Sequence, residues 1–548
     1  MKRKCKCCKR GCGEGGCNIT SGGAARRWLL AVVACLCALA SLPALSQTLR
    51  WAARGDAESM DPHTVAETLT IGMAALVHDS LVERDRDVRI VPGLATSWKA
   101  IDPKRWRFEL RRGVVFHDGS PFTADDVVFS ILRAQQPSSQ LNFYAGPLGT
   151  PVRIDDYTVE LRLERPDPIL LQHLSGVMIM SRTWAAKHHA ERVPNFRARE
   201  ESFSSRNANG TGRYRLVQRE PGVRTVLERN PAWWGRFEGN VQKVVFTPIA
   251  NDASRTAALL GGSVDFVNDL AVQDVERARA DPSLRVTVAP ENRLVFLGFD
   301  LWREESPYVG VKGANPLRDA RVREAFAYAI DTEAIKTRIM RGYSVPARCM
   351  AVALAGCMVD KLDVPLRPDV ARARKLMAEA GYEQGFDLTL DCPNDRYVND
   401  QAICVALVGM LARIDVRLKV DARPKTLFFP KVQSSDTSFY LLGWAGSFAD
   451  AQPVLDPLVH SRDDAAGKGA GNFGRIADPA LDRLIDAAGT ETDPERRSAL
   501  IGDAQRRVAE QFYYLPLHRQ TLFWASRANV HTVTTPNGVV RADWIWIE

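Results

Sequence analysis

The stretch 98–131 constrains the fold of this chain most strongly, because it encodes a hairpin. Apolar and polar residues alternate along 106–110, which is the period of a half-buried strand. Turn residues at Gly113 and Gly119 then enclose a short strand at 114–116. The local sequence therefore predicts two short strands joined by tight turns.

A helix is expected directly after this hairpin. Thr123 is a good N-cap residue, and Asp126 lies three residues further on, as in a capping box. Val127 and Ile131 then follow at helical spacing. Gly, Pro, Phe and Val in such a stretch are by default turn and core residues, so we expect a structural corner here.

The same residues carry a resemblance to a known family. The stretch is similar to the signature region of the peptide-type (family 5) solute-binding proteins of bacterial ABC importers. The residues that match its pattern in register are Phe108, Leu110, Arg111, Gly113, Val114, Phe116, His117, Asp118, Gly119, Pro121, Phe122, Thr123, Ala124, Asp126 and Val127. Segments 209–234 and 316–331 also resemble the family, and the likeness covers about 47–548. We expect His117 and Asp118 to build a corner of the first lobe and to touch no ligand.

The resemblance implies an α/β fold with a two-lobed periplasmic-binding-protein architecture, a hinge between the lobes and an extra β-rich subdomain in the first lobe. A chain of 548 residues is also too long for one hydrophobic core. The expected divisions are 1–46 as N-terminal extension and signal peptide, 47–295 as lobe I with the additional subdomain, 296–514 as lobe II, and 515–548 as the return to lobe I.

Hydrophobic period and capping residues predict the other elements. Strands are expected at 48–52, 81–84, 88–91, 157–163, 214–217, 224–227, 294–300, 387–390 and 416–420, and helices at 71–77, 251–260, 321–330, 370–380 and 400–413. The alternation of strand and helix after residue 370 indicates an α/β second lobe.

The net charge of +8 resides at the N-terminus. Residues 1–46 contain eight Lys or Arg against one acidic residue, Glu14, which leaves +1 for the rest of the chain. Because a nearly neutral chain lacks the electrostatic footprint of a nucleic-acid-binding protein, we expect no nucleic-acid partner.

The N-terminal segment has the pattern of a signal peptide. Arg26-Arg27 precede an apolar run, and Ala44-Leu45-Ser46 place cleavage before Gln47. Two alternatives remain open: a transmembrane anchor, for which the run is at the lower length limit, and a lipoprotein processed at Cys35. The predicted location is the periplasm.

Of the eleven cysteines, seven lie in residues 1–46, two of them in the apolar run, and four lie after Gln47. Five of them, Cys5, Cys7, Cys8, Cys12 and Cys17, lie in the extension, where an extended n-region is favoured over a metal-binding tail because the spacings match no zinc pattern. After export, the four remaining cysteines would meet an oxidising compartment. We expect the pairs Cys349–Cys357 and Cys392–Cys404, although four cysteines allow three connectivities.

Signatures of a secreted enzyme are missing from the sequence. There is no H-E-x-x-H and no G-x-S-x-G, and His188-His189 are adjacent rather than on one helical face. The glycine-rich segment 467–471 resembles a phosphate loop only loosely, so it is interpreted as a flexible loop. We therefore expect no catalysis, no cofactor and no metal site, with a secreted hydrolase as the less favoured class.

A ligand site needs aromatic walls and a few polar anchors. For a peptide-like zwitterion these would be an acid for the ammonium and an Arg for the carboxylate. The segment 441–450 resembles the family's G-W loop, which makes Trp444 and Asp450 candidates, although Asp450 is followed by Ala-Gln-Pro rather than Pro-Asp. Arg396 is the candidate for the carboxylate, and Glu67 and Tyr144 are weaker candidates from the first lobe.

Each candidate also has a structural alternative. Arg396 fits a solvated loop cation, Asp450 a turn or helix cap, and Trp444 a core aromatic. The resemblance implies a monomeric periplasmic substrate-binding protein that captures a peptide or peptide-like solute and delivers it to an inner-membrane ABC permease. A non-peptide solute, such as an opine, an oligosaccharide or a chelated metal, is the alternative within this class.

Overall fold

The computed structural model describes residues 47–351, 362–445, 450–464 and 466–548. The predictions for the signal peptide, the lipoprotein site at Cys35 and the cysteine-rich extension lie outside these residues, as does Cys357. None of the described helices is long and apolar enough to cross a membrane.

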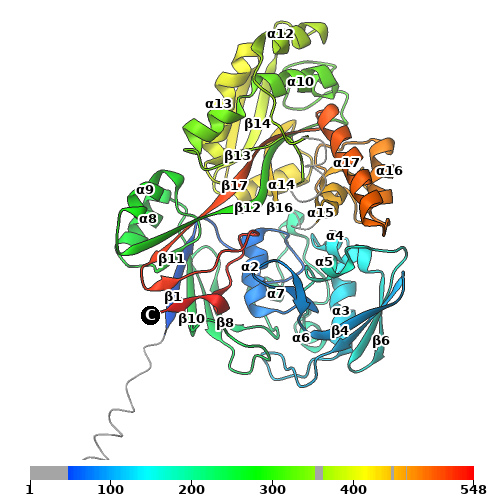
Figure 1. The fold of residues 1–548 in the computed structure, drawn as a ribbon, viewed down its shortest axis with the longest axis vertical. Helices are drawn as coiled ribbons and strands as arrows, with labels where there is room; N and C mark the ends of the chain where they lie inside the picture. Colours follow the sequence, from blue (N-terminus) through cyan, green and yellow to red (C-terminus); the bar gives the residue numbers. More distant parts are fainter. Residues whose placement is uncertain (1–46, 352–361, 446–449, 465) are drawn as a thin grey trace, which may run out of the picture. The chain divides into compact units, whose positions relative to one another are not determined.

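Residues 48–548 are organised around one mixed sheet, to which eleven of the described strands belong (Figure 1). The strand order is β15 (Arg417–Arg423), β14 (Asp387–Pro393), β16 (Phe439–Ala445), β12 (Leu284–Phe299), β17 (Tyr514–Arg527), β11 (Phe266–Val267), β1 (Thr48–Ala53), β10 (Lys243–Pro248), β9 (Arg224–Arg229) and β8 (Tyr214–Glu220), and β13 (Val345–Pro346) pairs with β17.

Two long antiparallel strands, β12 and β17, run through both halves of this sheet. Leu284–Pro290 of β12 pair with the C-terminal half of β17, and Leu294–Gly298 pair with its N-terminal half. The register shifts between these two stretches, so residues 291–293 form an irregularity at the crossing. We call the half that contains β1 and β8–β11 lobe I, and the half that contains β14–β16 lobe II.

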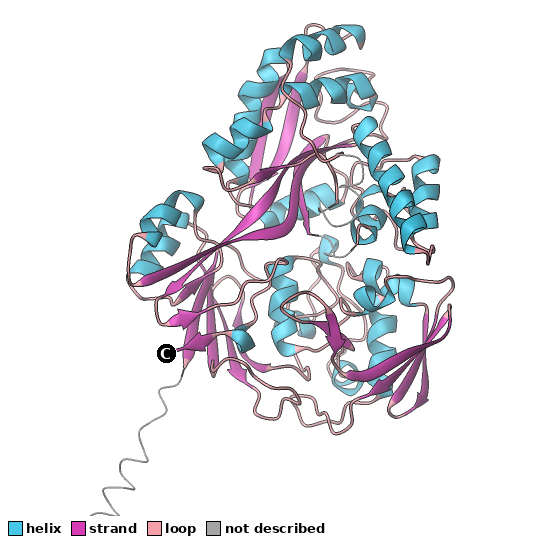
Figure 2. Ribbon diagram, viewed as in Figure 1, coloured by secondary structure: helices cyan, strands magenta, loops and turns pink. Residues whose placement is uncertain are grey.

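Lobe II packs helices on both faces of its strands (Figure 2). Along β12, Leu294 and Phe296 enter one core and Val295 and Leu297 the other, which is the period-two pattern of a strand buried on both faces. The helices of this lobe are α10 (Ala320–Ala329), α11 (Thr332–Ala334), α12 (Val370–Glu379), α13 (Asp400–Leu411), α14 (Lys425–Gln433), α15 (Gln452–Val454), α16 (Pro479–Ala488) and α17 (Pro494–Glu510).

Lobe I contains a separate four-stranded antiparallel sheet, as expected for the β-rich subdomain. Its order is β4 (Ala95–Asp102), β5 (Arg105–Leu110), β7 (Thr158–Arg162) and β6 (Thr150–Asp155). Small two-stranded sheets pair β2 (Val82–Arg84) with β3 (Ile90–Pro92) and β18 (Val530–His531) with β19 (Trp546–Ile547). The helices are α2 (Thr68–Val77), α3 (Ala124–Ala134), α4 (Asn142–Ala145), α5 (Leu170–Leu174), α6 (Arg182–Lys187), α7 (Phe203–Arg206), α8 (Asp252–Leu260), α9 (Val275–Arg279) and the short 3₁₀ helix η2 (Phe196–Ala198).

The hairpin-to-helix stretch forms a corner of this subdomain. Thr123 caps α3, and its backbone N–H donates to the Asp126 carboxylate at 2.9 Å, which confirms the capping box. The predicted strand at 114–116 is wrong, because only a single bridge, Val115 to Pro121, forms there. The Gly119 turn returns the chain too early for a continuous ladder.

Two of the family-like segments contact each other at this corner. The backbone N–H of His117 donates to the Gly210 carbonyl at 2.9 Å, and Nε2 of His117 lies 3.0 Å from the Gly212 carbonyl oxygen. A Cβ on Gly210 would lie 2.0 Å from the Val77 carbonyl oxygen, so only glycine allows this close approach. Burial lowers the pKa of His117 to about 4. The stretch 98–131 thus contributes to the packing of this corner.

The long β12 begins ten residues before the predicted start, at Leu284 rather than Leu294. Its first half alternates apolar and polar residues only as far as Val288, and Pro290 and the polar residues 291–293 separate it from the apolar run 294–299 that predicts the strand. The predicted lobe boundary at 295/296 falls inside β12, and the return boundary at 514/515 falls at the start of β17. These divisions stay predictions.

Candidate ligand-binding site

A cavity of about 640 Å³ lies between the two lobes where β12 crosses. This volume is in the range of small-molecule sites. Its lining comes from lobe I within 66–71, 136–144 and 192–197, from Arg293 of β12, and from lobe II within 396–397, 429–433, 442–445 and 462–473. Of the five ligand-site candidates, four line it: Glu67, Tyr144, Arg396 and Trp444.

Glu67 and Arg396 form a charged pair on the lining of this cavity. Glu67 is the N-cap of α2, where its Oε2 accepts from the backbone N–H of Thr70 at 2.9 Å. Its other oxygen, Oε1, lies 3.2 Å from Nη2 of Arg396. Lys425, at the start of α14, places its Nζ 3.8 Å from Oε2 of Glu67. One carboxylate of lobe I therefore faces two cations of lobe II.

The protonation states of this cluster follow from burial and charge. Burial raises the pKa of Glu67, but Lys425, Arg396 and the helix N–H groups outweigh it and lower the pKa to about 2. For Arg396, burial lowers the pKa, and the Glu67 carboxylate more than compensates, so the net pKa is raised. Both groups stay ionised across the neutral range.

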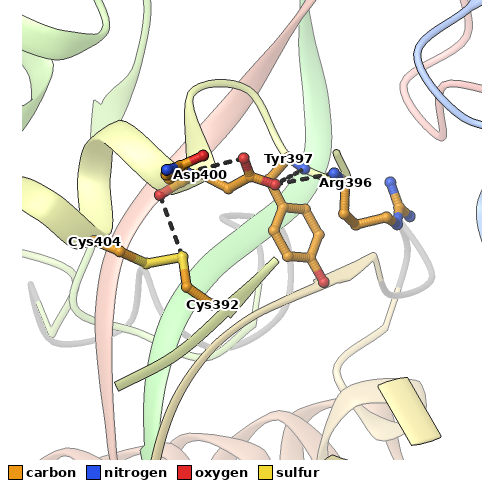
Figure 3. Close-up of a disulfide and its surroundings, with 6 residues drawn as sticks. Cys392, Arg396, Tyr397, Asp400 and Cys404 are labelled. Atoms are coloured by element: carbon orange, nitrogen blue, oxygen red, sulfur yellow. Dashed lines mark hydrogen bonds between the residues drawn. A yellow bond between two sulfur atoms is a disulfide. The ribbon is translucent and has the colours of Figure 1, made fainter. Parts of the chain in front are cut away.

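A disulfide holds the loop that presents Arg396, as Figure 3 shows. Cys392 at the end of β14 is bonded to Cys404 of α13, which confirms this predicted pair. Within the loop, the Asp400 carboxylate accepts from the backbone N–H groups of Arg396 and Tyr397, both at 2.9 Å. The Arg396 side chain points away from the disulfide. Burial raises the pKa of Asp400 to about 6.

Arg293 is a site residue that sequence reasoning missed. It lies in the irregularity of β12, where its Nη2 donates to Thr68 Oγ1 at 2.7 Å and its Nε donates to Glu291 at 2.8 Å. Its guanidinium lies 5.9 Å from the centroid of the Tyr397 ring. A break in the strand pattern at Glu291-Asn292-Arg293 was the available signal, because such breaks often redirect side chains.

Aromatic side chains from both lobes form the apolar part of the cavity. The rings of Phe143 and Trp444 approach with their centroids 6.0 Å apart, one from each lobe. The ring centroids of Tyr144 and Phe143 lie 4.1 Å apart, and burial raises the pKa of the Tyr144 hydroxyl. The Trp444 indole N–H donates to the Pro453 carbonyl at 3.2 Å, which fixes the ring at the end of β16.

Asp450 does not line the cavity. Its carboxylate is bound by both terminal nitrogens of Arg497, with Nη2 and Oδ1 2.7 Å apart, and Oδ1 also accepts from the Gln452 backbone N–H at 2.8 Å. This placement agrees with the alternative that Asp450 caps a turn. A contact between Asp450 and a ligand stays a prediction, as does the disulfide Cys349–Cys357.

No cluster of three or more His, Cys, Asp or Glu side chains suited to a metal lies within the described ranges.

Comparison with known proteins identifies the family. The model of the bacterial extracellular solute-binding proteins, family 5 Middle, matches residues 89–466. The Dipeptide-binding protein of Escherichia coli is 25% identical over 514 residues, which cover 88% of this chain and 91% of that protein.

Solved structures show the same fold. The dipeptide binding protein of Pseudoalteromonas sp. SM9913 in complex with Met-Leu superposes with a TM-score of 0.81 at 22% identity, over 92% of this chain and 100% of that one. AgaA from A. tumefacien R10 in complex with agropinic acid superposes with a TM-score of 0.80 at 21% identity, over 91% of this chain and 99% of that one. The architecture is thus the expected two-lobed periplasmic-binding-protein fold, and the chain belongs to the family 5 bacterial extracellular solute-binding proteins.

Proposed function

We propose that this protein is the periplasmic substrate-binding component of an ABC importer, that it captures a peptide or peptide-like small solute in the cavity between its lobes, and that it delivers the solute to an inner-membrane permease. The family supports the role in solute binding. The peptide ligand, the permease and the monomeric state belong to the proposal.

The state of Arg396 is the observation that carries the proposal. Its guanidinium lines the cavity, only 13% of the side chain is exposed, and Nε has no hydrogen-bond partner within the described part of the chain. A buried donor without a partner costs free energy, so a ligand acceptor would stabilise it. A carboxylate matches the guanidinium fork, which supports the proposal that Arg396 binds the ligand carboxylate.

Glu67 supplies the opposite charge for the same ligand. Its carboxylate stays ionised and lies beside Arg396, so the two groups suit the ammonium and the carboxylate of a zwitterion. Phe143, Tyr144 and Trp444 then offer apolar surface to a peptide backbone and its side chains. This combination of apolar walls and few polar anchors is typical of small-ligand sites.

Ligand capture needs no covalent chemistry. A two-lobed protein with a hinge closes around its ligand, and the ligand favours the closed form by the difference in its affinity for the two forms. Here the pairs Glu67–Arg396 and Glu67–Lys425 join lobe I to lobe II, so ligand binding and lobe contact involve the same side chains.

Native mass spectrometry of the protein purified from a periplasmic extract tests the proposal. We expect a co-purifying ligand whose mass equals that of a short peptide, and calorimetric binding of that peptide without turnover. The mass of an opine, an oligosaccharide or a metal chelate would support the non-peptide alternative. Conversion of the ligand by the protein would instead indicate a hydrolase.

A further inference from the structure

A second group of cations lies in the same cavity, formed by Arg197 of lobe I and Arg462 of lobe II. Within the described ranges, the Arg197 guanidinium has neither a hydrogen bond nor an ion pair. Arg462 is paired through Nε with Asp464 at 2.9 Å, but 73% of the Asp464 side chain is exposed. Solvent-exposed ion pairs of this kind contribute little to stability. The two guanidinium groups therefore share one weakly held counter-charge, the Asp464 carboxylate.

This group comes from other segments of the cavity lining than the Glu67–Arg396 pair. Arg197 is an exposed residue of the lining. Partial burial of its guanidinium and then the positive charge of Arg462 lower the pKa of Arg197, while Asp464 raises it. The charged groups that act on Arg396 are different ones, with Glu67 foremost. The cavity lining therefore carries Arg197 and Arg462 in addition to Arg396, together with the aromatic residues Phe143 and Trp444.

The loop that carries Arg197 is built by its own hydrogen bonds. The Asn195 side chain accepts from the Ala198 N–H at 3.2 Å and so caps η2, and the Asn195 N–H donates to Glu200 at 2.9 Å. The Val193 N–H donates to the Gln136 side chain at 2.8 Å, which fastens the loop to the cavity wall. These contacts fix the backbone that carries Arg197 at the cavity lining.

The facing loop of lobe II is also held by local bonds. The backbones of Asp463 and Lys468 exchange two hydrogen bonds, at 3.0 and 2.9 Å. The Lys468 ammonium is paired with Asp486 and lies 3.6 Å from Asp456, so the glycine-rich segment presents no free ammonium to the cavity. Arg462 is the cation that this loop contributes to the lining.

We propose that Arg197 and Arg462 form a second anion subsite, and that the ligand is an acidic di- or tripeptide whose additional carboxylate binds there while Arg396 binds the other. Guanidinium groups suit carboxylates because they donate two parallel hydrogen bonds. The inference rests on the proposed function, since it names the class of peptide for the same cavity.

Calorimetry with matched peptides tests this inference. The ligands are pairs of di- and tripeptides in which one member has Glu and the other has Gln at the same position. Successive pairs place this residue at each position of the peptide in turn. For at least one pair we expect the wild-type protein to bind the Glu peptide about tenfold more tightly or better, as charge-assisted hydrogen bonds imply. In the double variant Arg197→Gln, Arg462→Gln that preference should fall to within about twofold.

Arg199→Gln is the matched control, because Arg199 is an exposed cation of the same loop outside the cavity lining. It should keep the wild-type preference, and circular dichroism should show all variants folded. Binding of both peptides of every pair with equal affinity would overturn the subsite and leave the proposed function standing. Binding of no peptide would overturn both, and a preference that survives the double variant would overturn the assignment of these two residues.

Discussion

Arg396 of lobe II and Glu67 of lobe I form an ion pair inside the cavity, with Nη2 and Oε1 3.2 Å apart. Lys425 adds a second cation from lobe II, and its Nζ also donates to the Asp56 carbonyl oxygen at 2.9 Å. Glu67 is only 6% exposed and pairs with both cations, and Glu58 shares Lys425 with it at 3.5 Å. This carboxylate therefore lines the candidate cavity and also joins the two lobes.

Glu67→Gln should destabilise the protein by about 3 kcal/mol, because it leaves the buried Arg396 without its carboxylate partner and Lys425 with Glu58 alone, whose Oε1 lies 3.5 Å from Nζ. Urea denaturation followed by circular dichroism measures the change. Glu324→Gln is the control, since Glu324 pairs with the half-exposed Arg372 and should change stability by less than about 0.5 kcal/mol. Equal free energies of unfolding for the wild type and Glu67→Gln would show that the Glu67 charge does not stabilise the fold.

Arg396→Gln should lower the affinity for a free peptide by about tenfold or more, because a charge-assisted hydrogen bond is lost. A second ligand, the same peptide with an amidated C-terminus, isolates the contact. The wild type should prefer the free carboxylate, whereas the variant should bind both peptides alike. Arg423→Gln, outside the cavity, should behave as the wild type. A variant that still discriminates would show that another group binds the carboxylate.

Asp450→Asn separates the sequence-based role of Asp450 from its place in the structure. Because Arg497 would lose a well-buried partner, we expect a loss of stability of about 3 kcal/mol with little change in peptide affinity. Thermal denaturation and calorimetry on the same preparation give both numbers. Asp503→Asn, at a surface pair, is the control. A large loss of affinity at unchanged stability would favour the ligand contact predicted from the sequence.

Local sequence signals predicted the elements whose determinants lie within a few residues of one another. The Thr123 and Asp126 cap of α3 is one case, and Asn251 at the start of α8 is another. The two-lobed fold followed from the family-like motifs. The disulfide Cys392–Cys404 could be predicted because its two cysteines lie close together in the sequence.

Residues whose role depends on tertiary contacts escaped prediction. Lys425 meets Glu67 although 358 positions separate them, and nothing in its neighbourhood marks it as buried. Arg293 reaches the cavity only because the register of β12 shifts beside it. Asp450 was assigned from a motif, but Arg497, which binds it, lies on a helix far along the chain. The spacing of residues along the sequence carries no information about partners that only the tertiary fold brings together.

Removal of the disulfide by Cys392→Ala, Cys404→Ala should lower stability by about 3 kcal/mol through the entropy of the unfolded chain. It should also weaken peptide binding, because the loop that holds Arg396 loses its covalent closure. Denaturation and calorimetry measure the two effects. Val405→Ala, on the exposed face of α13, is the control for substitution in that helix. Unchanged affinity in the double variant would show that Asp400 alone positions the loop.

The stability of the protein should fall as the pH decreases from neutral, and His518 should account for part of the fall. This side chain of β17 is fully buried, neither ring nitrogen has a hydrogen-bond partner in the described structure, and burial lowers its pKa to about 4. Between that value and the ordinary pKa of about 6.5, the unfolded chain binds a proton that the folded protein does not. The folded state is therefore disfavoured progressively through this window as the pH drops.

His518→Leu removes this titration and should reduce the pH dependence. Relative to its effect at pH 8, the substitution should stabilise the protein at pH 5 by about 2 kcal/mol, the value that the pKa difference implies. Urea denaturation at both pH values measures it, and the pH 8 comparison absorbs any packing change. His531→Leu is the matched control, because 38% of the His531 side chain is exposed and it pairs with Glu548 at the surface. Parallel stability curves for wild type and His518→Leu would show that His518 titrates alike in the folded and unfolded chains.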